Sequence, residues 1–319
     1  MESQEEIKRL YESELKPQLA GMEKMRKYVK KLRIMAAVSA VIAFLFLSNY
    51  STTFELVGGI IFIIATIYCI YKAYVSFRKY HTQFKNEVVR KVIHLINPDY
   101  QYDPDKHIEK HEYLKSGIFK RDVDRYSGDD LVVGAIDKTP FKFSEIKTEY
   151  ETSTTDSDGD STTEWHTIFK GLFFIAEFNK NIEGQTFVFP EKDSSVINFF
   201  GKEKTKTKDF GELVKLENPA FEKVFSVYGS SQQEARYILT PVLMEAILNI
   251  YNTYGLIMYF SFKDENVSCA IPFSRDLFEP NVRKSGVNYQ DVQEMYVLFG
   301  LIETIVQELN LNTRIWTKD

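Results

Sequence analysis

Two uncharged apolar segments joined by a short polar loop constrain this chain more than any other feature. Residues 34–47 (IMAAVSAVIAFLFL) and 56–71 (LVGGIIFIIATIYCIY) contain no Asp, Glu, Lys or Arg, and only residues 48–55 separate them. A helix needs about 20 mostly apolar residues to cross a bilayer. Residues 32–50 and 54–72 reach that length if their aromatic residues lie at the interfaces. The pattern predicts a transmembrane helical hairpin over residues 34–72.

Basic residues flank this hairpin on both outer sides. The loop has no Lys or Arg, whereas the flanks carry Lys24, Arg26, Lys27, Lys30, Lys31 and Arg33 before the first segment and Lys72, Arg78, Lys79 and Lys85 after the second. By the positive-inside rule, both ends of the hairpin and both termini are expected in the cytoplasm. A signal peptide is excluded because a long charged stretch comes first and no small-residue cleavage site follows. The same flanks disfavour two buried core helices.

The rest of the chain predicts cytoplasmic structure on either side of the hairpin. Residues 1–33 predict a juxtamembrane helix, and residues 73–97 a helical stalk that ends at a turn signal, Asn97-Pro98. The first helix has a heptad-like stripe that suits either self-association or packing against the protein's own soluble domain. Pro17 is expected to mark a break in that helix or a new start. The stripe consists of Tyr11, Leu15, Met22, Met25, Val29 and Leu32.

Residues 98–319 predict a cytoplasmic α+β domain with an antiparallel sheet and a C-terminal helix over residues 289–309. The β-branched and aromatic runs predict strands at residues 131–136, 141–149, 167–178, 185–189, 213–216, 224–228, 256–262 and 266–272. Residues 152–164 predict a long hairpin loop, and residues 194–200 and 232–251 predict helices, the latter with a kink or restart at Pro241. A domain sub-boundary is expected near the basic loop 201–209, which suits phosphate or lipid headgroups as well as plain solvent.

Composition narrows the class of protein. The net charge of -5 argues against nucleic acid as a partner. The two cysteines, Cys69 and Cys269, lie in a predicted span and a predicted strand, so no disulfide is expected, in keeping with a reducing cytoplasm.

Two patterns resemble metal sites without completing one. Residues 103–112 (DPDKHIEKHE) predict a helix start that would place His107 and His111 on one face, but Ile108 stands where a zinc protease has glutamate. The loop acids Asp156, Asp158 and Asp160 suggest calcium, but the glycine is one place too early for an EF-hand. We expect no metal and no cofactor.

The chain lacks recognisable catalytic motifs. No phosphate-binding loop, dinucleotide fingerprint, nucleophile elbow or kinase signature is present, and nothing local activates Cys269. The most informative polar and aromatic residues suit either a ligand or partner site or structural roles at a strand end and a first helical turn. They are Trp165, His166, Lys170, Glu234 and Arg236. We expect a protein that is not an enzyme; the alternatives are a ligand- or lipid-headgroup-sensing domain and a hydrolase built around His166.

Four stretches carry a resemblance to a known family: residues 139–152 (TPFKFSEIKTEYET), 165–180 (WHTIFKGLFFIAEFNK), 234–241 (EARYILTP) and 278–280 (FEP). With the hairpin before them, the chain resembles the bacterial domain-of-unknown-function 3137 (DUF3137) proteins over most of residues 1–310. The resemblance implies a two-span protein of the bacterial inner membrane with a cytoplasmic domain, and no catalytic residue. Family members lie near genes for LemA-family membrane proteins, which implies an envelope-associated partner of that kind. We therefore expect a membrane-anchored binding, scaffold or regulatory module that forms homo-oligomers.

Overall fold

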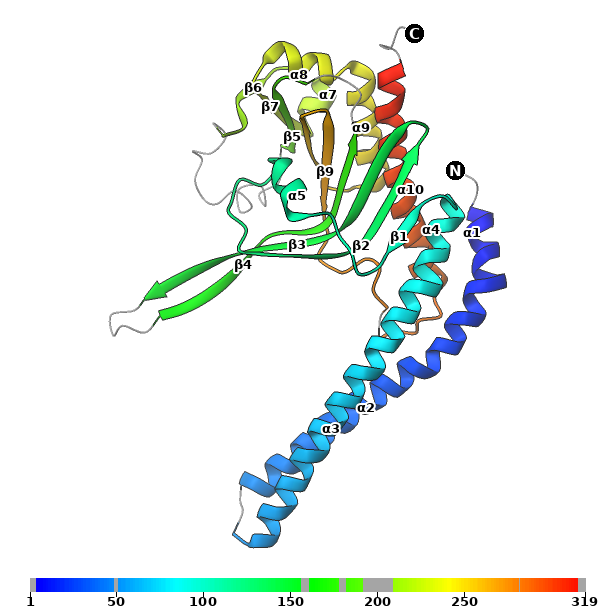
Figure 1. Ribbon diagram of the computed structural model, residues 1–319, viewed down its shortest axis with the longest axis vertical. Helices are drawn as coiled ribbons and strands as arrows, with labels where there is room; N and C mark the ends of the chain where they lie inside the picture. Colours follow the sequence, from blue (N-terminus) through cyan, green and yellow to red (C-terminus); the bar gives the residue numbers. More distant parts are fainter. Residues whose placement is uncertain are drawn as a thin grey trace. The chain divides into compact units, whose positions relative to one another are not determined.

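The computed structural model describes residues 4–48, 51–155, 161–177, 182–191, 209–280 and 282–314 (Figure 1). The chain forms two compact units. The helical unit consists of Met1–Ile96 and Phe278–Val297, and the sheet unit consists of Asn97–Leu277 and Leu298–Asp319.

Two continuous helical arms build the helical unit. The first arm contains α1 (Gln4–Leu10), η1 (Tyr11–Leu15) and α2 (Lys16–Ser48), and the second contains α3 (Thr53–Phe84), η2 (Lys85–Val89) and α4 (Arg90–Ile96). The second arm ends at Ile96, directly before Asn97-Pro98, as predicted. Pro17 neither breaks nor restarts the first arm. A wide π-helical turn precedes it, closed by a hydrogen bond from the Lys16 N–H to the Tyr11 carbonyl. Because proline has no N–H, the helix lacks one further backbone hydrogen bond at Pro17 itself.

Helices α2 and α3 pack side by side (Figure 1). The predicted stripe is confirmed at Met22, Val29 and Leu32, but Arg26 is buried in place of Met25. The buried positions of α2 recur at steps of three and four residues: Leu19, Met22, Arg26, Val29, Leu32, Ala36, Ser39 and Ala43. Ser39 Oγ donates a hydrogen bond to the Phe62 carbonyl across the pair at 2.9 Å. Near the loop, a Cβ atom on Gly59 would lie 2.5 Å from the Leu47 side chain, so glycine permits the close approach.

Helix α3 begins with a capping box. Thr52 is the N-cap of α3, and its side chain accepts from the Glu55 N–H while Glu55 accepts from the Thr52 N–H at 3.0 Å. This capping box satisfies helix N–H groups that would otherwise lack partners. It explains why one charged residue stands between two uncharged segments.

The sheet unit contains one nine-stranded antiparallel sheet in the order β1-β2-β3-β4-β9-β8-β5-β7-β6. Its strands are β1 (Gln101–Asp103), β2 (Arg125–Ile136), β3 (Thr139–Thr155), β4 (Ser161–Glu177), β5 (Gln185–Pro190), β6 (Glu212–Val214), β7 (Phe225–Gly229), β8 (Tyr259–Lys263) and β9 (Asn266–Pro272). Its helices are α5 (Lys110–Lys115), α7 (Pro219–Glu222), α8 (Gln232–Ile238) and α9 (Pro241–Tyr254), and the end of α10 (Tyr289–Arg314) also belongs to it. The predicted α+β class, antiparallel sheet and C-terminal helix are confirmed.

Alternation along the central strands supplies a core on each face of the sheet. On the α5 face, Tyr113 contacts Phe119 and Phe173, with ring centroids 5.4 and 4.9 Å apart. On the opposite face, Phe143 contacts Phe299 of α10 at 5.7 Å. Aromatic rings bury large apolar areas, so the high phenylalanine content of the sequence is used in these two layers.

Three local predictions are corrected or cannot be compared. Residues 152–155 and 161–164, predicted as part of a loop, are paired strand residues of β3 and β4, because threonines such as Thr154 and Thr162 suit a strand surface. Beyond Glu149, where pairing with β2 ends, the two strands form a ribbon that extends past the rest of the sheet (Figure 1). The helix predicted at 194–200 and most of the loop 201–209 lie outside the described residues.

The long helix predicted at residues 232–251 divides where its proline indicated. Helix α8 ends at Ile238 and α9 begins at Pro241. Thr240 is the N-cap of α9, accepting from the Leu243 N–H at 3.3 Å. Proline is well suited to the first helical position because its missing N–H needs no partner there.

Candidate functional site

The five residues predicted as a ligand or partner site fall into two separate groups. Trp165, His166 and Lys170 lie on β4, whereas Glu234 and Arg236 lie on α8. Helix α8 contacts β5, β6 and β7, and two strands, β9 and β8, separate β4 from β5 in the sheet. The structure therefore does not bring the five residues into one site.

The β4 group forms cation–π and stacking contacts at the root of the ribbon. The guanidinium of Arg125 lies 3.6 Å from the Trp165 ring centroid, and that of Arg121 lies 3.9 Å from the Tyr150 ring. Tyr150 in turn stacks on His166 at 5.0 Å. Trp165 remains 36% exposed, so an amphipathic aromatic surface faces outward here. Aromatic and arginine side chains of this kind are common in protein interfaces.

His166 lacks the geometry of an oriented general base. Its Nε2 lies 2.8 Å from Thr152 Oγ1, and the carboxylate of Glu164 approaches the same nitrogen at 3.8 Å. A base in a hydrolytic triad needs the hydroxyl on one ring nitrogen and the carboxylate on the other. The arrangement fits a side chain held on a strand surface. Lys170, further along β4, forms an ion pair with Asp276 at 2.9 Å.

The α8 group connects the start of the helix to the turn before β5. Glu234 Oε1 accepts from the N–H groups of Glu183 and Gly184 at 2.8 and 3.1 Å. Arg236 Nε donates to the Lys215 carbonyl at 3.1 Å. These contacts satisfy backbone groups of neighbouring segments, which is the structural alternative considered from the sequence.

The histidine pair does not have the predicted helical spacing. Helix α5 begins only at Lys110, so His107 precedes it and His111 lies within it. The backbone is still extended at Glu109, with φ of -65° and ψ of 145°, and before it the buried Ile108 donates its N–H to Ser144 Oγ at 3.0 Å. His107 Nδ1 contacts the Ile108 carbonyl at 2.8 Å. The calcium candidates Asp156, Asp158 and Asp160 lie outside the described residues.

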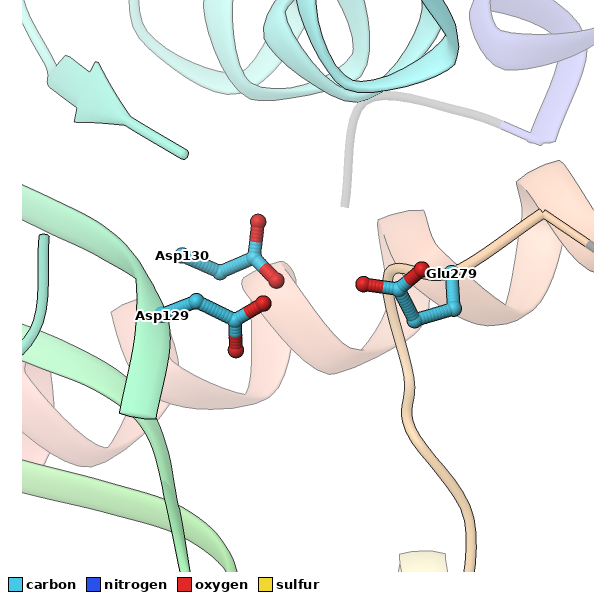
Figure 2. A group of neighbouring side chains, drawn as sticks. All are labelled: Asp129, Asp130 and Glu279. Atoms are coloured by element: carbon cyan, nitrogen blue, oxygen red, sulfur yellow. The ribbon is translucent and has the colours of Figure 1, made fainter. Parts of the chain in front are cut away.

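Buried carboxylates in the sheet unit are a feature that the sequence analysis missed. Glu145 of β3 is 8% exposed and accepts from the Leu277 N–H at 2.7 Å. Asp130 is 1% exposed, lies at an irregularity in β2 and accepts from the Tyr102 hydroxyl at 2.5 Å. Figure 2 shows Asp130 and its neighbour Asp129 projecting from β2. Burial, followed by the charge of Asp130, raises the pKa of Glu145 to about 8.

A second missed cluster lies in the helical unit. Glu279 is bound by two residues of the second arm: His81 Nε2 lies 2.6 and 2.7 Å from its two carboxylate oxygens, and Lys85 Nζ lies 2.9 Å from Oε1. The Lys85 side chain is 1% exposed. Burial raises the pKa of Glu279. The hydrogen bonds and charges of His81 and Lys85 together lower it by more than burial raises it, so the pKa lies below its ordinary value.

An open groove of about 380 Å³ lies in the sheet unit, at the end of the sheet near the β8–β9 turn. Val133, Lys142 and Ile175 are register neighbours on β2, β3 and β4, so they form a row across one face. Lys142 pairs with Glu112 of α5. The complete lining is Glu112, Val133, Pro140, Phe141, Lys142, Ile175, Ala176, Glu177, Asp264, Glu265 and Asn266.

Large apolar side chains stand exposed along α2 and α3. Both arms are long and apolar enough to cross a membrane, and 22% and 11% of their most apolar stretches are buried. A core helix of a soluble protein would bury most of such a stretch. The exposed side chains include Ile34, Val38, Val41, Phe44 and Leu45 on α2, and Phe54, Ile60, Ile61, Ile64, Ile67, Tyr68 and Tyr71 on α3.

Fold and surface define the class: an α+β protein with a nine-stranded antiparallel sheet and two helices that are candidates for crossing a membrane. Residues 167–311 match the model of the family described as "Protein of unknown function (DUF3137)". The match confirms the resemblance over that part of the chain; it contains residues 234–241 and 278–280 and most of 165–180, whereas residues 139–152 precede it.

One solved structure is similar at a low level. The crystal structure of the mycobacterial trehalose monomycolate transport factor A, TtfA, has 10% sequence identity and a TM-score of 0.35, with 67% of this chain and 94% of that chain covered. No curated protein sequence matches the chain.

Proposed function

We propose that this protein is a membrane-anchored binding or scaffold module of the bacterial inner membrane, and not an enzyme. The observation that carries the proposal is the exposed apolar surface of α2 and α3. Residues 32–48 of α2 span about 26 Å at 1.5 Å per residue, close to the roughly 30 Å hydrocarbon thickness of a bilayer. Removing apolar surface from water is favourable by roughly 25 cal/mol per Å².

The proposed topology places both termini and the sheet unit in the cytoplasm. The basic residues before and after the two spans support this orientation, as does the lack of Lys and Arg in the turn. The exposed aromatic and arginine side chains at the root of the ribbon, such as Trp165 and Arg125, support a role in binding a protein.

Two single cysteine variants test the topology in spheroplasts of bacteria that produce the protein. Ser51 lies in the turn between the spans and Ser153 lies on the exposed part of β3. We expect a membrane-impermeant maleimide to label S51C in intact spheroplasts, and S153C only after lysis. The native Cys69 and Cys269 are buried and provide little background. Labelling of both variants in intact spheroplasts, or recovery of the protein in the soluble fraction, would contradict the proposal.

The proposed partner is an envelope-associated membrane protein of the LemA family, bound by a homo-oligomer of this chain. Co-purification of the two proteins from detergent-solubilised membranes tests this part, with light scattering to give the stoichiometry. A monomer that elutes without the LemA-family protein would contradict it and would leave the membrane anchor unaffected.

A further inference from the structure

The floor of the groove near the β8–β9 turn has apolar side chains on either side of Lys142, and its rim is acidic. Its floor is formed by side chains of β2, β3 and β4, including Val133, which is 39% exposed although it lies on a paired strand. Pockets for small ligands measure about 300–1,000 Å³, so a groove of about 380 Å³ has room for one or two side chains. Its openness to solvent suits a segment that lies across it.

The rim carries more negative than positive charge. Lys142 is paired with Glu112, and Lys115 lies 3.7 Å from Asp264. Glu177 and Glu265 have no ion pair with any basic residue in the part of the chain that the structure describes. Two carboxylates therefore remain at the rim to meet an incoming cation.

The backbone of the rim holds acids where other residues would fit more easily. Asp264 and Glu265 form the two-residue turn between β8 and β9, with φ of 49° and 62°. Asn-Gly is the sequence that such a turn favours, because L-residues adopt left-handed φ values at a cost. Residues held in sparsely populated conformations tend to lie at functional positions. The conformation of this turn is therefore a second indication, besides the groove itself, that the carboxylates of Asp264 and Glu265 have a function.

We propose that the groove binds a short extended segment of a partner protein that carries lysine or arginine beside an apolar side chain. Apolar side chains of the segment contact Val133 and Ile175 on either side of Lys142, and the cation lies between Glu177 and Glu265. The inference rests on the proposed binding function, since it assigns the chemistry of a partner. Its test is separate from the cysteine labelling, so either result can fail without the other.

The test titrates the peptide acetyl-Leu-Lys-Leu-Lys-amide with the full chain in nanodiscs. Binding is followed by ligand-observed NMR. We expect saturable binding that the double variant E177Q/E265Q weakens about tenfold, because each exposed ion pair contributes a few-fold in affinity. V133T should weaken binding two- to threefold by making the floor polar. Acetyl-Leu-Glu-Leu-Glu-amide should not bind, and N-acetyl-lysine amide should bind far more weakly than the peptide.

A matched control separates the groove from general electrostatics. The double variant E151Q/E217Q removes two exposed acids of β3 and the β6–α7 connection and changes the net charge by the same amount. We expect its affinity to stay within twofold of the wild type. Absence of peptide binding, equal binding by the wild type and E177Q/E265Q, or an equal loss in both double variants would overturn the proposal. Equal binding of N-acetyl-lysine amide would also overturn it, since the apolar floor would then contribute nothing.

Discussion

Replacing Glu279 with alanine is expected to release residues 278–288 from the helical arms. The substitution removes the carboxylate that binds His81 and Lys85, and the Lys85 side chain is 1% exposed. Breaking a buried ion pair from one side costs about 3–5 kcal/mol, because an ammonium is left without that compensation. Glu279 is itself 26% exposed, which reduces the effect. We expect a loss of about 2–3 kcal/mol in local stability.

Hydrogen exchange of the full chain in nanodiscs measures this release. Other contacts also hold the segment: Arg26 Nη1 donates to the Val282 carbonyl at 2.9 Å, and the Gly286 N–H points to Glu23 Oε2 at 3.4 Å. The loss should therefore appear as local opening, with amide protection in residues 278–288 falling about 30- to 150-fold. Amides of β5 in the sheet unit should keep their wild-type rates.

A second substitution identifies the cause of the release. In the variant K85M/E279A the ammonium is replaced by an apolar side chain of similar length, and we expect at least half of the lost protection to return. The exposed-acid variant E217A is the control and should match the wild type. Protection within twofold of the wild type in E279A would show that Glu279 does not hold the segment.

The elements that could be predicted are those whose signal is local. The uncharged segments 34–47 and 56–71 indicate long apolar helices, and the restart at Pro241 follows from the chemistry of a helix N-terminus. The ribbon was missed because threonine and serine near residues 152–164 also form turns, and only cross-strand pairing decides between the two. The start of α5 was missed because the segment before it makes tertiary contacts, such as the bond from the Ile108 N–H to Ser144 Oγ of β3, that no local pattern predicts.

The candidate sites show the same division. His81 and Glu279 are 198 residues apart, and no local pattern connects them. The groove combines residues of four strands, one helix and a turn that are distant in sequence. Glu145 alone had a readable signal: in FKFSEIK it shares the strand face of Phe141 and Phe143, so an acid occupies a core-facing position. The grouping of Trp165 with Glu234 failed because sheet order cannot be derived from residue types.

The buried Glu145 makes a prediction about pH. Its pKa is raised from 4.5 to about 8 by burial and by Asp130, so the folded chain binds a proton that the unfolded chain has lost at neutral pH. Stability from this group is fully present below pH 4.5 and is lost as the pH rises toward about 8. We expect the sheet unit to lose roughly 2–4 kcal/mol between pH 5 and pH 8, since each unit of pKa shift corresponds to about 1.4 kcal/mol.

Glutamine at this position removes the titration and keeps the shape. E145Q retains an oxygen to accept from the Leu277 N–H, which lies 2.7 Å from Glu145 Oε1. At pH 8 we therefore expect E145Q to be more stable than the wild type by about 2–4 kcal/mol, and at pH 5 we expect the two to agree within about 1 kcal/mol. Urea titrations followed by tryptophan fluorescence measure this in a W316F background, in which Trp165 of the sheet unit is the single tryptophan.

The control for this experiment is E151Q on the same strand. Glu151 is exposed, so its neutral variant should follow the pH dependence of the wild type. An E145Q protein with that same dependence would mean that Glu145 is already ionised in the fold at neutral pH. Because Glu145 is 8% exposed and Asp130 1% exposed, two charges would then be held close together with little solvent. That arrangement would need a compensating cation, so the result would direct attention to the groups around Asp130.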